Sequence, residues 1–270
     1  MINLETFNKE NNFVVACCTF YEDKIVQTLL GSSFHPGGLN LTNQIGKQMN
    51  FSSSDKILDL ASGLGASAIY LAQTFSCSVV GVDISKINVS KAQQLAKDKH
   101  VEHLVSFHQG DISSLPFEDN SFDYVISECS FCLFQDKNIV GREIYRILKP
   151  NGRVIITDIA IEKELPIDIT NLIYKVACIA SALSIAEYRE YFIQNGFTIE
   201  SIIDDKNILL KLAEDIKKKV FVMELASGLK KIKLQKEQLQ EIKSLIKKAK
   251  QLLNDGYATY MTLIVQKKSL

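Results

Sequence analysis

A short apolar run that contains one carboxylate is followed directly by a stretch of mostly small residues. This order of residues is suited to holding a ligand. Lys56–Leu60 is expected to form a buried strand, and Ala61-Ser62-Gly63-Leu64-Gly65 follows it directly, before the helical pattern of Ala66–Phe75. Small side chains let a backbone turn tightly and approach a ligand, and the first amides of a helix carry partial positive charge. We therefore expect a ligand-binding loop at Asp59–Gly65, although an ordinary strand-to-helix turn shows the same pattern.

Acidic residues close the strands that are expected to follow. Asp83 comes about 20 residues after the loop, where a carboxylate accepts hydrogen bonds from ribose hydroxyls. Gly110-Asp111-Ile112 follows the third strand, and Glu128 ends the fourth. A dinucleotide site normally has a third glycine, which Ala66-Ser67-Ala68 does not supply. The pattern favours a nucleoside cofactor without a pyrophosphate.

Four motifs in succession resemble those of class I S-adenosylmethionine-dependent methyltransferases, including the quinone-biosynthesis type. The matching runs are Ile57–Gly65, Val80–Ser85, Gly110–Ile112 with Leu115–Phe117 and Ser121–Asp123, and Glu143–Arg153. The resemblance covers about Phe51–Asp158. Ala61 departs from it, because the family usually has glycine there. Alanine costs little at a negative φ, so we expect only a small change in the shape of the loop.

The resemblance implies S-adenosyl-L-methionine as cofactor and assigns a role to each motif. The methionine part would be held by Asp59 and the backbone of the loop residues Ala61, Ser62, Gly63, Leu64 and Gly65. Asp83 would bind the ribose and Asp111 the adenine amino group, while Ile84 and Ile112 would flank the ring. Glu128 would lie near the ammonium and the acceptor. The sulfonium makes the methyl group electrophilic, and the protein aligns an acceptor with it.

The cysteines suggest one acceptor. The chain has six, Cys17, Cys18, Cys77, Cys129, Cys132 and Cys178, which we expect to be reduced. The segment around Cys178 resembles part of the arsenite methyltransferases, and thiols at Cys18, Cys129 and Cys178 would bind a trivalent metalloid such as arsenite. A nearby sulfonium would lower their pKa. Alternatively, these residues are small buried apolar groups, as we expect for Cys77 at the start of a strand.

Short apolar runs alternate with helical patterns and predict an α/β fold. We expect a Rossmann-like, doubly wound, mostly parallel sheet of seven strands with helices on both faces. The expected strands are Lys56–Leu60, Ser78–Asp83, Val105–Gln109, Phe122–Glu128, Arg153–Ile159, Phe197–Ile203 and Tyr257–Gln266. The expected helices are Leu41–Met49, Ala66–Phe75, Lys86–Lys99, Asn138–Leu148, Ile185–Asn195, Lys206–Ala226 and Lys231–Leu253.

This pattern divides the chain into an N-terminal cap (1–50), a core (51–204), a two-helix insertion (205–255) and a last core strand (256–270). Lys206–Asn254 holds 13 lysines and five acidic residues, a local excess of +8. A solvated face on two packed helices accounts for these lysines, as does a positive cap over an anionic substrate or a membrane surface. The insertion is expected to pack on the core or on a second subunit, which would make a homo-oligomer.

His35-Pro36-Gly37-Gly38 precedes the first expected helix. It is either a simple turn or a segment that closes over the methionine end of the cofactor, with His35 as a possible base.

Composition excludes several classes of protein. The formal net charge is zero and apolar residues make up 46%, so nothing indicates a nucleic-acid binder. No apolar run is long enough to cross a membrane, and Met1–Asn12 does not resemble a secretory signal, so we expect a cytoplasmic protein. Histidine spacing indicates no metal site. Glu128-Cys129-Ser130-Phe131 differs from the run typical of base amino-group methylation. A non-catalytic cofactor-binding or interaction module remains an alternative to the enzyme.

Overall fold

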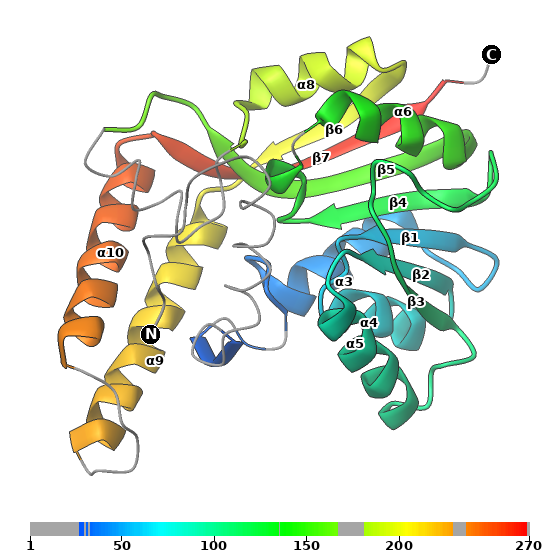
Figure 1. Cartoon of the computed structure of the whole chain (residues 1–270). Coiled ribbons are helices and arrows are strands. Elements are labelled where there is room, and N and C mark those ends of the chain that lie inside the picture. The colour runs from blue at the N-terminus through cyan, green and yellow to red at the C-terminus, as the bar shows by residue number, and fades with distance from the viewer. Residues whose placement is uncertain are drawn as a thin grey trace.

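The computed structural model describes residues 27–29, 31, 33–134, 136–166, 181–228 and 236–268. A seven-stranded sheet in the order β3-β2-β1-β4-β5-β7-β6 forms its centre (Figure 1). β7 is antiparallel to both of its neighbours, and the other paired strands are parallel. The seven-stranded, mostly parallel sheet expected from the sequence is thereby confirmed. The strands are β1 Lys56–Leu60, β2 Ser78–Asp83, β3 Val105–Gln109, β4 Phe122–Glu128, β5 Leu148–Ile161, β6 Phe197–Asp204 and β7 Ala258–Lys267.

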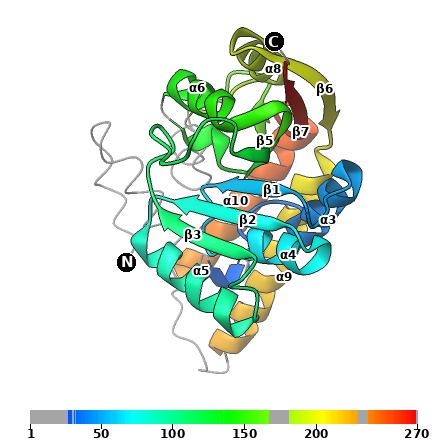
Figure 2. The ribbon, with the colours of Figure 1, turned by 90° about the vertical axis from the view of Figure 1, so that its right-hand side faces the viewer.

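Helices cover both faces of the sheet, because each face carries its own apolar cluster. The helices are α3 Gly38–Met49, α4 Ala66–Phe75, α5 Lys86–Asp98, α6 Lys137–Ile147, α8 Ile185–Gln194, α9 Asn207–Gly228 and α10 Lys236–Asn254, with a 3-10 turn η1 at Phe131–Leu133. One cluster joins the sheet to α6 and α8. The other joins it to α3, α4 and α5, so the sheet is doubly wound (Figure 2). No helix in the described part of the chain is long and apolar enough to span a membrane.

Most expected boundaries lie close to the observed ones, and the start of β5 differs most within the described residues. The helix predicted over Asn138–Leu148 ends at Ile147, and β5 starts at Leu148 instead of Arg153. Pro150 disfavours helical geometry in the residue before it, so the chain turns to extended structure earlier than expected. In the insertion, α9 ends at Gly228, two residues beyond the expected end at Ala226.

The insertion extends from the carboxyl edge of the sheet as an antiparallel helix pair (Figure 1). Its small core contains Ala213 and Val220 of α9 and Leu239 and Ile246 of α10. Ion pairs cross between the helices, from Lys243 to Glu224 and from Lys250 to Glu214. At their bases Leu209 and Leu253 join the core of the α3–α5 face. The insertion therefore packs on the core, as expected.

The segment nearest the N-terminus that the structure describes contacts the same helix pair. Leu29 packs against its core, and the backbone carbonyl of Leu29 accepts a 2.7 Å hydrogen bond from Nζ of Lys219. On α9, Phe221 and Val222 are 58% and 62% exposed. The formation of a homo-oligomer through the insertion stays a prediction.

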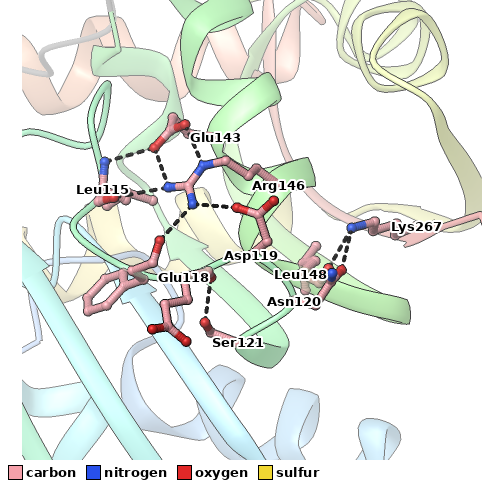
Figure 3. A network of polar contacts seen from close by, with 10 residues as sticks. Leu115, Glu118, Asp119, Asn120, Ser121, Glu143, Arg146, Leu148 and Lys267 are labelled. Carbon is pink, nitrogen blue, oxygen red and sulfur yellow. Dashed lines mark hydrogen bonds and ion pairs between the residues drawn. The ribbon is translucent and has the colours of Figure 1, made fainter.

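One arginine fixes the connection between β3 and β4, which carries Asp111 and Ile112. Arg146 of α6 binds Glu143 through two hydrogen bonds of 2.8 and 2.9 Å (Figure 3). Its remaining donors reach Asp119 at 3.0 Å and the carbonyls of Phe117 and Leu115. A planar guanidinium satisfies such a divergent set of acceptors better than any other side chain. The connection is thus pinned to α6 although it has no regular structure.

Candidate active site

A buried aspartate lies at the centre of the site. Asp59 is the last residue but one of β1 and only 3% exposed, and its Oδ2 has no hydrogen-bond partner among the described residues. Burial raises the pKa of this carboxyl well above the usual value, and the neighbouring carboxylates of Glu128 and Asp83 raise it further. Three acidic groups from β1, β2 and β4 therefore share one small region. Such a concentration of negative charge is suited to a cationic ligand.

The glycine loop packs tightly over β3. At Gly65 the backbone has φ of +74°, and an added Cβ would lie 2.4 Å from the ring of Phe107. Glycine is therefore required both for the turn into α4 and for the close packing beneath it. Inside the loop, the Gly65 amide donates to the Ser62 carbonyl at 2.8 Å, and the Ser62 amide donates to Val82 at 3.0 Å.

Ala61 contradicts the expectation made for it. Its φ is +54°, in the left-handed region, and not the negative value under which alanine would cost little. A side chain with a Cβ is strained there by about 1–2 kcal/mol. The substitution of the family's usual glycine therefore keeps the glycine geometry and stores strain in the loop.

Asp83 connects the loop to the end of β2. Its Oδ2 accepts a hydrogen bond from the Gly63 amide at 2.8 Å, and its Oδ1 accepts one from the Ser85 amide at 2.8 Å. Each carboxylate oxygen has a second lone pair, so these bonds leave acceptor capacity for ligand hydroxyls. Ser85 also caps α5, because its hydroxyl accepts from the Asn88 amide.

Three expected adenine contacts lie at the rim, beside Asp83. The Gly110 amide donates to the Asp83 carbonyl at 3.1 Å, which brings the ends of β2 and β3 together. Ile84 is 48% exposed, whereas Ile112 packs partly against the core. Asp111 is exposed and its Oδ1 accepts two hydrogen bonds from Ser113. An exposed apolar residue next to a hydrogen-bonding carboxylate is compatible with a stacked heterocycle.

Glu128 lies against side chains of which only His35 stood out in the sequence. The hydroxyl of Thr42 on α3 lies 2.9 and 3.3 Å from its two carboxylate oxygens. His35 Nε2 lies 3.4 Å from Oε2 and 3.3 Å from the hydroxyl of Ser67 on α4. Buried threonine and serine in amphipathic helices give no sequence signal of such contacts. The arrangement joins β4, α3 and α4 around one carboxylate.

The two described cysteines after β4 differ in their surroundings. Cys129 is partly buried with φ of +54°, and its amide donates to the Thr157 carbonyl. Cys132 is 1% exposed, and its amide donates to Oδ2 of Asp158 at 2.7 Å. Burial and the carboxylates of Asp158 and, for Cys129, Glu128 raise the pKa of both thiols. This direction is opposite to the lowering expected from a sulfonium neighbour.

The remaining cysteines do not extend this cluster in the described structure. Cys17, Cys18 and Cys178 lie outside the described residues. Cys77 is fully buried in the core, and burial raises the pKa of its thiol to about 11. No group of three or more metal-ligating side chains occurs within the described ranges.

The residues fit the sulfonium cofactor expected from the sequence. Asp59 Oδ2 and Ser62 Oγ are buried polar atoms without partners in the described part of the chain, as expected of atoms that await a ligand. The cofactor carries a sulfonium and an ammonium, which match the three carboxylates in charge. A pyrophosphate, by contrast, would meet repulsion from Asp59, Asp83 and Glu128.

The strain at Ala61 gives a first prediction. Ala61→Gly should stabilise the protein by about 0.5–1 kcal/mol, because glycine adopts φ of +54° without a Cβ penalty. Chemical denaturation of the ligand-free protein measures the change. Ala66→Gly, at the helical first position of α4, is the matched control and should destabilise by a similar amount. A loss of stability in both variants would contradict the strain.

The buried Asp158 gives a second prediction, on pH. Burial raises its pKa to about 6 despite hydrogen bonds from Cys132, Ile159 and Tyr188. The native state then binds this proton more tightly than the unfolded state, so the carboxyl reduces stability as pH rises from about 4 to 6. Relative to Asp158→Asn, the wild type should lose on the order of 2–3 kcal/mol over that range.

Urea denaturation at several pH values measures this difference, and Asp98→Asn on the exposed side of α5 is the control. The control should follow the wild type at every pH. Parallel curves for the wild type and Asp158→Asn would show that Asp158 titrates normally.

Comparisons with known proteins agree with this geometry. A family model described as a methyltransferase domain matches residues 51–196. The chain is 34% identical over 169 residues to an arsenite methyltransferase of Aquipseudomonas alcaligenes, covering 57% of this chain and 47% of that protein. It is 30% identical over 166 residues to phosphoethanolamine N-methyltransferase 1 of Arabidopsis thaliana, covering 62% and 30%. The chain thus spans half or less of the length of these curated relatives.

The fold also matches a solved structure. Phosphoethanolamine N-methyltransferase 2 of Haemonchus contortus, solved with S-adenosyl-L-methionine, gives a TM-score of 0.79 at 21% identity over 98% of this chain and 59% of that one. The family model covers more than half of the chain. The protein therefore belongs to the methyltransferase-domain family, with the Rossmann-like fold and the S-adenosylmethionine cofactor of the class I methyltransferases.

Proposed function

We propose that this chain methylates a small-molecule acceptor at the carboxyl edge of its sheet, and that a thiol-bound metalloid such as arsenite is that acceptor. The observation that carries the site is the cluster of Asp59, Asp83 and Glu128 beside the glycine loop, in which Oδ2 of Asp59 has no hydrogen-bond partner within the described structure. When bound, S-adenosylmethionine supplies a methyl group made electrophilic by a sulfonium.

The chain's own residues divide the work of binding. Asp59 and the loop amides hold the methionine part, and Asp83 accepts hydrogen bonds from the ribose hydroxyls. Ile84 and Ile112 enclose the adenine, and Asp111 accepts from its amino group. Glu128 binds the ammonium. Support comes from their common edge of the sheet and from the hydrogen bond that links Gly63 to Asp83.

Ribose binding by Asp83 gives a testable outcome. Asp83→Ala should weaken binding of S-adenosylhomocysteine by about 10-fold or more, measured by calorimetry, because charge-assisted hydrogen bonds are lost. The same variant also removes the hydrogen bond from Gly63, which weakens binding for a second reason. A second ligand is therefore needed to separate the two effects. Removing the ribose 2′-hydroxyl from the ligand should cost the wild type several-fold in affinity but cost Asp83→Ala little. Equal costs in both proteins would contradict the ribose contact.

The metalloid acceptor is supported by the position of one thiol. Cys129 follows Glu128 directly and is only partly buried, whereas Cys132 is enclosed and bonded to Asp158. Arsenite exchanges its hydroxyls for thiols with release of water, and the thiol proton leaves in that water, so a protonated Cys129 is competent to bind. Cys18 and Cys178 would supply the other two sulfurs. Three sulfurs would hold the arsenic with its lone pair free, and S-adenosylmethionine, when bound, would supply the electrophilic methyl group that this lone pair accepts.

Acceptor assays with arsenite, a thiol reductant and S-adenosylmethionine test this proposal. The wild type should form methylated arsenic, and Cys129→Ser should lower the rate by about 100-fold or more, as should the corresponding changes at Cys18 and Cys178. Cys77→Ala, in the distant core, is the control and should retain activity.

The same assay should include amines as alternative acceptors, because some relatives are named as N-methyltransferases. Methylation of glycine, sarcosine or phosphoethanolamine, with none of arsenite, would overturn the metalloid acceptor but leave methyl transfer intact. Cofactor binding without transfer to any acceptor would favour the non-catalytic module.

A further inference from the structure

His35 lies where three elements meet behind the proposed cofactor site. It is 7% exposed, and its Nε2 lies within hydrogen-bonding range of Thr42 Oγ1 on α3, at 3.4 Å, and of Ser67 Oγ on α4, at 3.3 Å. Nε2 also lies at an ion-pair distance of 3.4 Å from Oε2 of Glu128 on β4. The side chains of His35 and Glu128 are each only 5% exposed. A buried ring at such a junction controls how its neighbours are placed.

The turn around His35 fixes the ring relative to α3. The His35 carbonyl accepts from the Gly38 amide at 3.2 Å, and Nδ1 lies 3.2 Å from the Pro36 carbonyl. Gly37 has φ of +83°, and a Cβ there would lie 2.8 Å from Cβ of Leu41. The ring is therefore presented by a turn with little freedom.

Hydrogen-bond chemistry sets the direction of the contacts. The Thr42 hydroxyl proton points to Glu128 Oε1, at 2.9 Å. Glu128 accepts only, so His35 holds it through an Nε2 proton. The Pro36 carbonyl beside Nδ1 also accepts only, so the form of the ring that satisfies both contacts is the imidazolium, which has a proton on each nitrogen. The Glu128 and Asp59 carboxylates repel each other, which is one cause of the raised pKa of Asp59. His35 and Thr42 together counter that repulsion.

We infer that His35 is a positioning residue, which holds the Glu128 carboxylate in place to receive the ammonium of the cofactor. The inference rests on the proposed role of Glu128. His35 contacts no reacting atom in this assignment, and its effect passes through one carboxylate. Its loss should therefore weaken binding of ligands that carry the amino-acid end and spare ligands without it.

Two ligands separate this role from simple support of the fold. S-adenosylhomocysteine carries the ammonium, whereas 5′-methylthioadenosine has the same nucleoside and lacks the amino-acid end. His35→Ala should weaken the first by about 10-fold in calorimetry and change the second by less than about twofold. His35→Gln, which keeps an N–H donor near the Nε2 position, should recover most of the loss. His103→Ala, on an exposed loop, is the control and should change neither ligand.

A double variant tests the route through Glu128. If His35 acts by holding that carboxylate, His35→Ala combined with Glu128→Gln should bind S-adenosylhomocysteine no more weakly than Glu128→Gln alone. Additive losses, or equal losses for both ligands with His35→Ala, would overturn the inference. If Glu128→Gln itself leaves S-adenosylhomocysteine binding unchanged, the proposed role of Glu128 fails instead. The ribose test at Asp83 stands independently of both results.

Discussion

Mutual repulsion among buried carboxylates is the constraint around which this site is organised. Asp59, Asp83 and Glu128 end or nearly end three neighbouring strands, so the sheet itself forces them together. Burial makes their charges costly, and the pKa of Asp59 rises as a result. A folded protein accepts such a cost where a ligand offsets it. A cofactor that carries a sulfonium and an ammonium is suited to offset this cost.

The surrounding structure limits this repulsion in the absence of ligand. Asp83 is neutralised in part by two backbone amides, and Glu128 by hydroxyl and imidazole groups from outside the sheet. Among the described residues, Oδ2 of Asp59 has no hydrogen-bond partner of this kind. The three carboxylates are thus unequal, and Asp59 on β1 is the least compensated of them.

Much of this arrangement was predictable from local patterns. The strands, the loop and the acidic residues at strand ends follow from short-range periodicity, which is why β1 to β4 were placed with their observed bounds. Backbone dihedral angles were harder to predict from the sequence. Ala61 looked harmless because a residue type does not reveal its φ, and the surrounding contacts impose +54°.

Contacts between distant segments were not predictable. Thr42 and Glu128 are 86 positions apart, and nothing in an amphipathic helix marks which polar residue turns inward to a strand end. His35 was noted as part of a turn and as a possible base, but its contact with Glu128 was not foreseen. The helix end expected at Ala226 lies two residues from the observed end of α9 at Gly228, because serine and glycine are local signals. Local rules succeed where neighbours in sequence decide the outcome.

The antiparallel strand β7 has a consequence for how this protein family diversifies. β6 ends and β7 begins at adjacent positions, since Asp204 pairs with Met261 and the Asp205 amide donates to the Tyr260 carbonyl. Everything between them, 206–257, leaves and returns at one point on the carboxyl edge. Such a segment can be lengthened, shortened or exchanged without disturbing the strand order. The segment 206–257 can therefore change as a separate unit, while the strand ends that carry Asp59, Asp83 and Glu128 stay as they are.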